Sequence, residues 1–202
     1  MVICHQKKCI FIHIPKTAGT SIEQFIKDNG QNHIELIGVS NNRSMHHYTA
    51  HELKNIFPTL YNNYYKFSIV RNPYERLLSE YYWTPVPNLG FKSGRKKADF
   101  LYHVINIVKN NKYNENIYYD HFLPQYCFIC NNNKKLVIDQ LFKYEDLIWV
   151  SQYLKKKLEI NSDFPYLNKS KSSIKKDDWT HNQKEKIYKL YKNDFLLFGY
   201  EK

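Results

Sequence analysis

Short apolar runs alternate along the chain with longer stretches in which apolar residues recur at helical spacing. The first run, residues 9–14, is rich in β-branched side chains and predicts a buried strand. Small and hydroxylic residues follow it, and Ile22, Phe25 and Ile26 then mark one face of a helix. Gly30 is expected to end this helix. Residues 9–30 therefore predict a strand, a tight turn and a helix.

The same order returns further along the chain. Residues 67–70 predict a second strand, after which Asn72 is expected to cap a helix that begins at Pro73. Further helical patterns cover residues 98–110, 147–158 and 181–192, the last with a capping box formed by Thr180 and Gln183. Strands that alternate with helices predict an α/β fold, with a central parallel β-sheet flanked by helices in a single domain over residues 1–202.

The turn after the first strand has the composition of an anion site. Free amide groups and the positive end of the helix dipole face this turn. Lys16 adds a full charge, and hydroxyl donors come from Thr17, Thr20 and Ser21. A Walker-type loop does not fit, because the lysine precedes the turn and no glycine opens it. The pattern predicts a phosphate site of another kind.

A second candidate phosphate site follows the second strand. Arg71 falls at the carboxyl end of that strand, where ligands gather in open α/β sheets, and its planar guanidinium matches a phosphate. Ser79 lies two helical turns beyond Asn72. We expect Arg71 and Ser79 to bind a ligand and Arg76 to lie on a solvated helix face.

Both segments resemble signatures of sulfotransferases that use 3′-phosphoadenosine 5′-phosphosulfate (PAPS). Residues 15–21 resemble the 5′-phosphosulfate loop, and residues 71–79 resemble the Arg-Asn-Pro-x-x-Arg-x-x-Ser signature that binds the 3′-phosphate. Residues 120–125, 136–147, 168–170 and 191–200 are similar to later segments of the membrane-type carbohydrate sulfotransferases. The resemblance implies a P-loop-like nucleotide-binding fold and PAPS as donor. The donor-binding residues that it implies are Lys16, Thr17, Ala18, Gly19, Thr20, Ser21, Arg71, Ser79, Asn168 and Ser170.

Sulfuryl transfer needs a base for the acceptor hydroxyl and a positive charge at the leaving phosphate, a role that suits Lys16. Histidine titrates nearest neutrality, and the resemblance offers two. His47 aligns with the histidine of a His-x-Thr-Ala-x-Glu-Leu pattern, and His121 lies in a motif close to the acceptor in relatives. We favour His47 and keep His121 open. His13 is expected in the core or in a supporting role, and Glu23 and Glu52 are weaker alternatives for the base.

The net charge of +11 implies an acidic partner. A carbohydrate acceptor, including one that carries acidic groups, agrees with this charge and with the resemblance. The alternatives are a non-sugar hydroxyl acceptor, a polyanion- or nucleic-acid-binding module, and a kinase-like protein that would prefer ATP and magnesium. No helix-turn-helix, zinc-finger or RNA-recognition signature supports specific nucleic-acid binding.

The remaining patterns concern metals and location. Cys4, Cys9, Cys127 and Cys130 allow a zinc hypothesis, but Cys9 opens the first strand and is expected in the core. We expect structural cysteines and no metal. No apolar run approaches the roughly 20 residues that span a bilayer, and no secretory signal is visible, so we expect a cytoplasmic protein. The sequence leaves the oligomeric state open.

Overall fold

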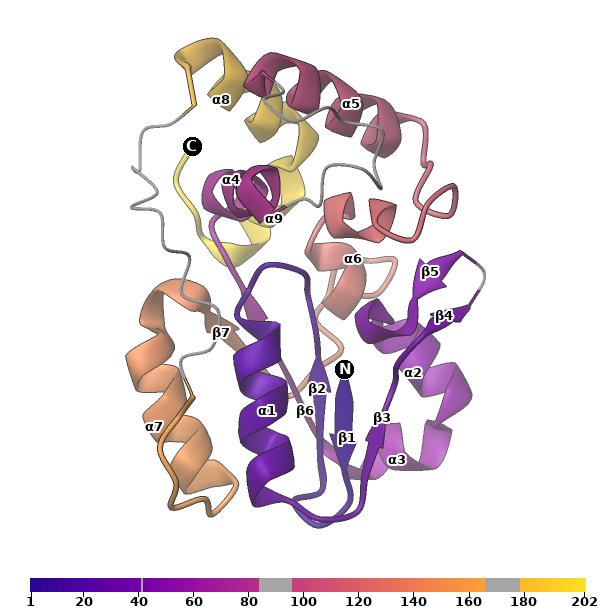
Figure 1. Cartoon of the computed structure of the whole chain (residues 1–202), viewed down its shortest axis with the longest axis vertical. Helices are drawn as coiled ribbons and strands as arrows, with labels where there is room; N and C mark the ends of the chain where they lie inside the picture. The colour runs from indigo at the N-terminus through magenta and orange to yellow at the C-terminus, as the bar shows by residue number, and fades with distance from the viewer. Residues whose placement is uncertain (41, 84–95, 166–178) are drawn as a thin grey trace. The chain divides into compact units, whose positions relative to one another are not determined.

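The computed structural model describes residues 1–40, 42–83, 96–165 and 179–202, which fall into two compact units (Figure 1). We call them the sheet unit and the helical unit and describe each by itself. The sheet unit comprises Met1–Gly38, Met45–Arg71 and Gln125–Lys171. The helical unit comprises Val39–Ser44, Asn72–Pro124 and Ser172–Lys202. The single domain predicted over residues 1–202 stays a prediction.

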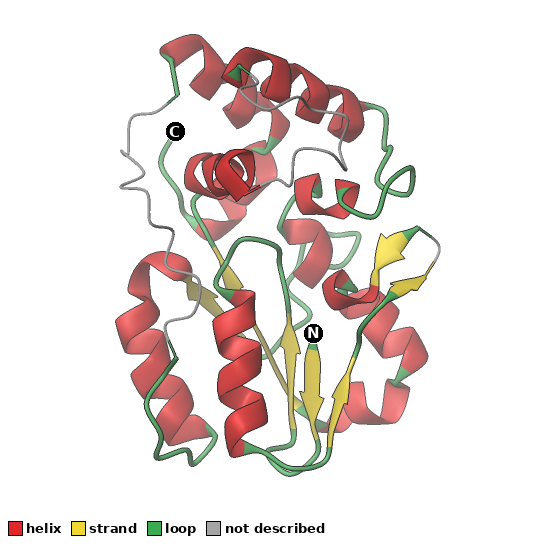
Figure 2. Cartoon of the chain, in the orientation of Figure 1, coloured by secondary structure: helices red, strands yellow, loops and turns green. Residues whose placement is uncertain are grey.

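The sheet unit is built on a sheet of strand order β3-β1-β2-β6-β7 (Figure 2). Its strands are β1 (Val2–Cys4), β2 (Cys9–Ile12), β3 (His33–Glu35), β6 (Tyr65–Val70) and β7 (Gln140–Lys143). The predicted parallel sheet is confirmed for β2, β6 and β7. β1 runs antiparallel to both of its neighbours, which the sequence analysis did not anticipate. A four-residue turn joins β1 to β2, and such short connections form hairpins.

Helices bury one face of this sheet. The sheet unit contains α1 (Gly19–Asn29), α2 (Ala50–Ile56), α3 (Pro58–Asn63), α6 (Tyr126–Ile129) and α7 (Leu147–Lys157), with the 3₁₀ turns η1 (Met45–His47) and η3 (Tyr144–Asp146). Alternate strand residues pack with the apolar stripes of α1 and α7 in one cluster. Its members include Cys9, Phe11, Ile22, Phe25, Phe67, Ile69, Phe142, Val150 and Leu154. The predicted helices after the first strand and over residues 147–158 are confirmed, as is the core position of Cys9.

The helical unit has its own core. It contains α4 (Pro73–Trp83), α5 (Lys97–Lys109), η2 (Tyr119–Phe122), α8 (His181–Leu190), α9 (Lys192–Phe198) and a short ribbon of β4 (Val39–Ser40) and β5 (Arg43–Ser44). The buried side chains that fill it are Leu77, Leu78, Phe100, Leu101, Val104, Ile107, Phe122, Trp179, Ile187, Tyr191 and Phe195. Across both units, the described residues include no helix that is long and apolar enough to cross a membrane.

Two helix starts in this unit follow the sequence prediction. The Asn72 side chain accepts a hydrogen bond of 2.9 Å from the amide of Tyr74, and Pro73 is the first residue of α4. Thr180 and Gln183 form the predicted capping box of α8, in which each side chain binds the other residue's amide. Such caps satisfy amide groups that a helix leaves without internal partners.

Arg76 corrects the prediction of a solvated helix face. Its side chain is buried, and its guanidinium donates to the carbonyl oxygens of His121 at 3.1 Å and Leu123 at 3.0 Å. The guanidinium also lies 5.5 Å from the centre of the Tyr191 ring. The planar guanidinium carries several N–H donors, so it can bind two neighbouring backbone carbonyls at once. Arg76 therefore ties α4 to the segment that carries His121.

We expect Arg76→Met to lower the free energy of unfolding by about 2–4 kcal/mol, because one buried and one partly buried carbonyl lose their donor. Urea unfolding monitored by circular dichroism measures this. Lys109→Met, on an exposed position of α5, removes the same charge and is expected to change stability by less than about 0.5 kcal/mol. Equal stability of the two variants would contradict a bridging role for Arg76.

Candidate active site

The turn between β2 and α1, residues 15–21, is a tightly bonded loop that we call the phosphate loop. Lys16 and Ala18 both adopt left-handed backbone conformations with φ of 68°, which side chains other than glycine rarely do. The Thr17 hydroxyl is buried and donates to the carbonyl of Ile14 at 2.8 Å. Ala18 is the N-cap of α1 and accepts from the amide of Ser21. The loop thus holds a helix N-terminus, with its positive dipole end, directly beyond the sheet.

Arg71 is held beside this loop from several sides. The Gln125 side chain accepts from the Arg71 amide at 2.9 Å and donates to its carbonyl at 2.8 Å. The guanidinium donates to the carbonyl of Lys16 at 3.3 Å and lies 4.1 Å from the centre of the Tyr144 ring. Tyr144 is in reach because β6 and β7 pair in parallel, with Val70 opposite Lys143. Arg71, the first residue of the second predicted phosphate segment, therefore contacts the phosphate loop within the sheet unit.

His13 packs against the inner side of the phosphate loop. It follows the last residue of β2, is buried, and its Nδ1 lies 2.9 Å from Glu23 Oε1 on α1. A Cβ added to Gly19 would stand 1.9 Å from His13 Nε2, so only glycine fits there without movement. The expected core or supporting position of His13 is consistent with these contacts.

His47 lies beside His13 in the turn that precedes α2. Its ring is buried and meets the His13 ring edge-on, with 5.1 Å between ring centres. Thr49 and Glu52 form the capping box of α2, in which the Glu52 carboxylate accepts from the Thr49 amide at 2.7 Å. The spacing of the His-x-Thr-Ala-x-Glu-Leu pattern is thus the spacing of a capped helix that anchors a histidine. Glu52 serves as a cap, which makes it unsuited to the alternative role of base.

A family comparison agrees with this geometry. A family model described as the sulfotransferase family matches residues 1–201. The chain belongs to the sulfotransferase family. A search of curated proteins finds no match. The protein is therefore a sulfotransferase, an enzyme that moves a sulfuryl group from a sulfonate donor to a hydroxyl acceptor, and the predicted family is confirmed.

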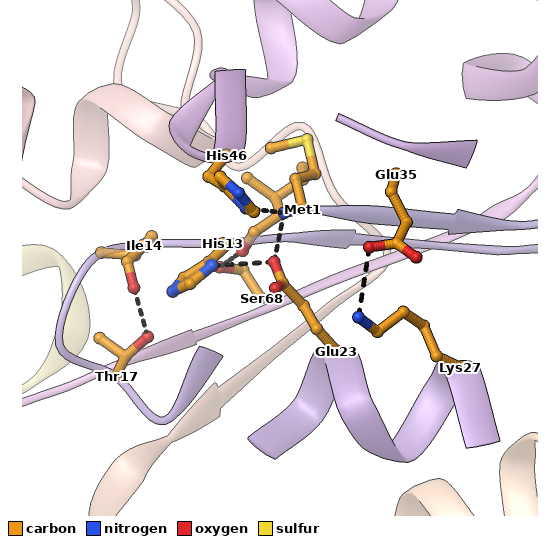
Figure 3. Close-up of polar contacts among 10 residues, drawn as sticks. Met1, His13, Ile14, Thr17, Glu23, Lys27, Glu35, His46 and Ser68 are labelled. Atoms are coloured by element: carbon orange, nitrogen blue, oxygen red, sulfur yellow. Dashed lines mark hydrogen bonds and ion pairs between the residues drawn. The ribbon is translucent and has the colours of Figure 1, made fainter. Parts of the chain in front are cut away.

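Glu23 of the sulfotransferase is a carboxylate held by positive groups. Its Oε1 contacts the amino group of Met1 as well as His13 (Figure 3). Burial alone would raise the pKa of Glu23, but the hydrogen bond and charge of His13 and the charge of the Met1 amine lower it to about 2. A carboxylate with so low a pKa is a weak base at neutral pH. Glu23 therefore holds its neighbours in place and does not suit the alternative role of base.

The other candidate histidine of the sulfotransferase lies in the helical unit. His121 is buried, its Nδ1 lies 3.0 Å from Glu80 Oε2 on α4, and its ring stacks on Trp83 with 5.2 Å between centres. Ser79 lies half-buried on the same helix. The contacts of the sheet unit join Lys16, Gly19, Arg71 and His47 into one region, and Ser79 and His121 are placed within the other unit. Asn168 and Ser170 lie outside the described residues.

His13, Glu23 and His46 together have the composition of a metal site, with ligand atoms within 4.8 Å of one another. The Met1 amine, however, already contacts Glu23 and lies 3.0 Å from His46 Nδ1. Burial and this neighbouring positive charge lower the pKa of His46. Because the carboxylate is already held by two nitrogen groups, we assign no metal to it.

The sequence analysis missed Gln125 and Tyr144 as partners of Arg71. Both residues belong to segments that resemble family motifs, but nothing in their local pattern indicates where their side chains point. A glutamine that binds both backbone groups of one residue acts like an added strand partner. Strand pairing brings Tyr144 to Arg71, and Gln125 reaches Arg71 from the start of α6.

We expect Gly19→Ala to destabilise the protein by about 1–3 kcal/mol, because the added methyl group overlaps the His13 ring. His13→Ala should relieve the overlap, so the double variant should be less destabilised than the sum of the two single variants. A double-mutant cycle from urea unfolding measures this coupling. Strict additivity would show that the loop does not rest on His13.

Proposed function

We propose that this sulfotransferase moves the sulfuryl group of PAPS to a hydroxyl of a carbohydrate, with a histidine as general base. The observation that carries the proposal is the hydrogen bond from Arg71 to the carbonyl of Lys16. It joins the two segments that resemble the 5′-phosphosulfate and 3′-phosphate signatures. A nucleotide with phosphates at both positions is the ligand for which such a pair of sites is suited.

The donor fits the residues present. The amide groups at the start of α1 and the ammonium group of Lys16 suit the 5′-phosphate, with Thr17, Ala18, Gly19, Thr20 and Ser21 supplying the loop. Since the Thr17 hydroxyl proton is engaged with Ile14, its contribution to the donor is through the backbone amide. Arg71 and Ser79 are assigned to the 3′-phosphate by resemblance. Asn168 and Ser170 are assigned to the donor site by resemblance.

The chemistry is an in-line displacement at sulfur. The acceptor oxygen forms a bond to sulfur as the bond between sulfur and the 5′-phosphate oxygen breaks, and the electron pair of that bond stays on the phosphate. Lys16 and the loop amides stabilise this growing negative charge, while a histidine takes the acceptor proton. The transferred sulfuryl group carries only one negative charge, so a metal clamp is less needed than in phosphoryl transfer.

We assign the base to His47 in preference to His121. The His47 ring packs against His13, the histidine on which the phosphate loop rests. A base must reach the acceptor oxygen close to the sulfur atom, and that atom follows the 5′-phosphate. His121 is held by Glu80 and Trp83. The resemblance puts its motif close to the acceptor, so His121 stays the rival candidate for the base.

The acceptor class rests on charge and on the resemblance. With a net charge of +11, the protein attracts anionic molecules in general, and acidic glycans are among them. The resemblance to carbohydrate sulfotransferases favours a sugar hydroxyl over other hydroxyl compounds.

We expect 3′-phosphoadenosine 5′-phosphate (PAP) to stabilise the protein against heat more than ADP does. A ligand at a hundred times its dissociation constant adds about 2.7 kcal/mol to the free energy of unfolding. Arg71→Ala should remove the preference for PAP over ADP, and Lys16→Ala should weaken both nucleotides. Differential scanning fluorimetry measures these shifts.

The control is Lys54→Ala, which removes one charge from an exposed position of α2 and should leave PAP binding unchanged. Equal stabilisation by PAP, ADP and ATP, or none by any of them, would overturn the proposed donor. An affinity for DNA that falls steeply as the salt concentration rises, without a preference among nucleotides, would then favour the polyanion-binding alternative.

We expect His47→Ala to lower kcat by about 100- to 10,000-fold, with the PAP affinity changed by only a few-fold, because a base acts in the chemical step. Sulfate transfer from labelled PAPS to a panel of oligosaccharides measures kcat, and calorimetry measures PAP binding. His121→Ala is the matched comparison. A larger loss of kcat in His121→Ala, with the fold intact, would reassign the base.

A further inference from the structure

His13 is a buried histidine that the proposed reaction does not use. Its Nδ1 lies 2.9 Å from Glu23 Oε1, and both residues are about 9% exposed (Figure 3). An ionised carboxylate can only accept a hydrogen bond, so His13 donates from Nδ1. Glu23 thereby sets both the position of the Nδ1 proton and the plane of the ring.

The opposite edge of the His13 ring lies against the phosphate loop at Gly19. His13 Nε2 lies where a side chain on Gly19 would start, at 1.9 Å from an ideal Cβ. Gly19 is the first residue of α1, so its backbone belongs to the helix start that the 5′-phosphate is proposed to face. If the His13 ring turned, the support beneath this part of the loop would be lost.

The ring also contacts the proposed base. His47 meets it edge-on, with the ring planes 89° apart. On another side the His13 ring stacks on Phe11, at 26° and 5.8 Å between centres. His13 is thus packed between a core phenylalanine and His47, and its hydrogen bond with Glu23 restrains the rotation of the ring.

We propose that Glu23 and His13 form a positioning pair for sulfuryl transfer. The Glu23 carboxylate holds His13 in one tautomer and one orientation, and His13 in turn supports the phosphate loop at Gly19 and orients the ring of His47. The part of this inference that concerns catalysis rests on the proposed function. His13 and Glu23 are positioning residues, because the groups that they hold are the ones assigned to the donor and the acceptor.

A role limited to filling space makes a different prediction. If His13 only packed the core, Glu23→Ala would lower stability without changing the state of the histidine rings in the folded protein. If the hydrogen bond matters, Glu23→Gln should retain most of the function, because its amide oxygen can still accept from Nδ1. Rescue by the glutamine variant therefore separates the two roles.

The first measurement needs no donor. Nitrogen-15 NMR of the imidazole groups, with signals assigned through His13→Gln and His47→Gln, reports the tautomer of each histidine. We expect His13 to be the Nδ1–H tautomer in the wild type and in Glu23→Gln. In Glu23→Ala, we expect a mixture of tautomers and shifted ring signals of His47. Unchanged His13 and His47 signals in Glu23→Ala would overturn the inference.

The second measurement links the pair to the donor and to the chemical step. Glu23→Ala should weaken PAP binding about tenfold and lower kcat by at least as much, which is the loss expected for a buried hydrogen bond to a charged group. Glu23→Gln should stay within about threefold of the wild type in both. All values are taken well below each variant's Tm, so that partial unfolding does not contribute.

Glu35→Ala is the matched control. Glu35 lies near the same edge of the sheet and pairs with Lys27 at 3.2 Å, so the variant removes an equal charge without touching His13. It should leave the His13 and His47 signals and the PAP affinity unchanged, while the His33 signal is expected to shift because Glu35 also pairs with His33 at 3.4 Å. If the wild type itself does not bind PAP, the proposed function fails, and the histidine spectra alone decide whether Glu23 orients His13 and His47. If PAP binds but Glu23→Ala binds it as tightly as the wild type, the positioning role is wrong.

Discussion

The parallel pairing of β2, β6 and β7 is the constraint on which the candidate site depends. Parallel strands end at the same edge of a sheet, so the residues after them meet although they are far apart in the chain. This pairing places Arg71 beside Tyr144 and within hydrogen-bond distance of the Lys16 carbonyl. Gln125 then fixes the backbone of Arg71 from a fourth segment. A change of register by one residue would turn these side chains to the opposite face.

Features with a local physical cause were predictable from the sequence. The helix starts at Pro73 and His181 depend on caps within three residues, and the phosphate loop follows from a strand, a small-residue turn and a helix. Arg76 could not be placed in this way, because an arginine on a helix is usually solvated and its partners here are carbonyls 45 and 47 residues away. The antiparallel β1 was missed because three apolar residues carry no information about strand direction.

The pattern around His47 shows how a sequence motif can combine a structural and a chemical requirement. Thr49 and Glu52 bind each other's backbone at the start of α2, so their spacing is that of a capping box. The cap fixes where the helix begins and therefore where the preceding turn places His47. Sequence reasoning identified the histidine through resemblance, but only the structure separates the anchoring residues from the proposed base.

The phosphate loop is strained, and its surroundings are arranged to hold it. Left-handed conformations at Lys16 and Ala18 cost on the order of 1–2 kcal/mol each, so an isolated loop of this sequence would relax. The buried bond from Thr17 to Ile14, the bond from Arg71 to Lys16, and the His13 ring against Gly19 all oppose that relaxation. These contacts come from the strand, from the second phosphate segment and from the proposed positioning pair. The three contacts therefore hold the same loop, and we expect the loss of any one of them to loosen it.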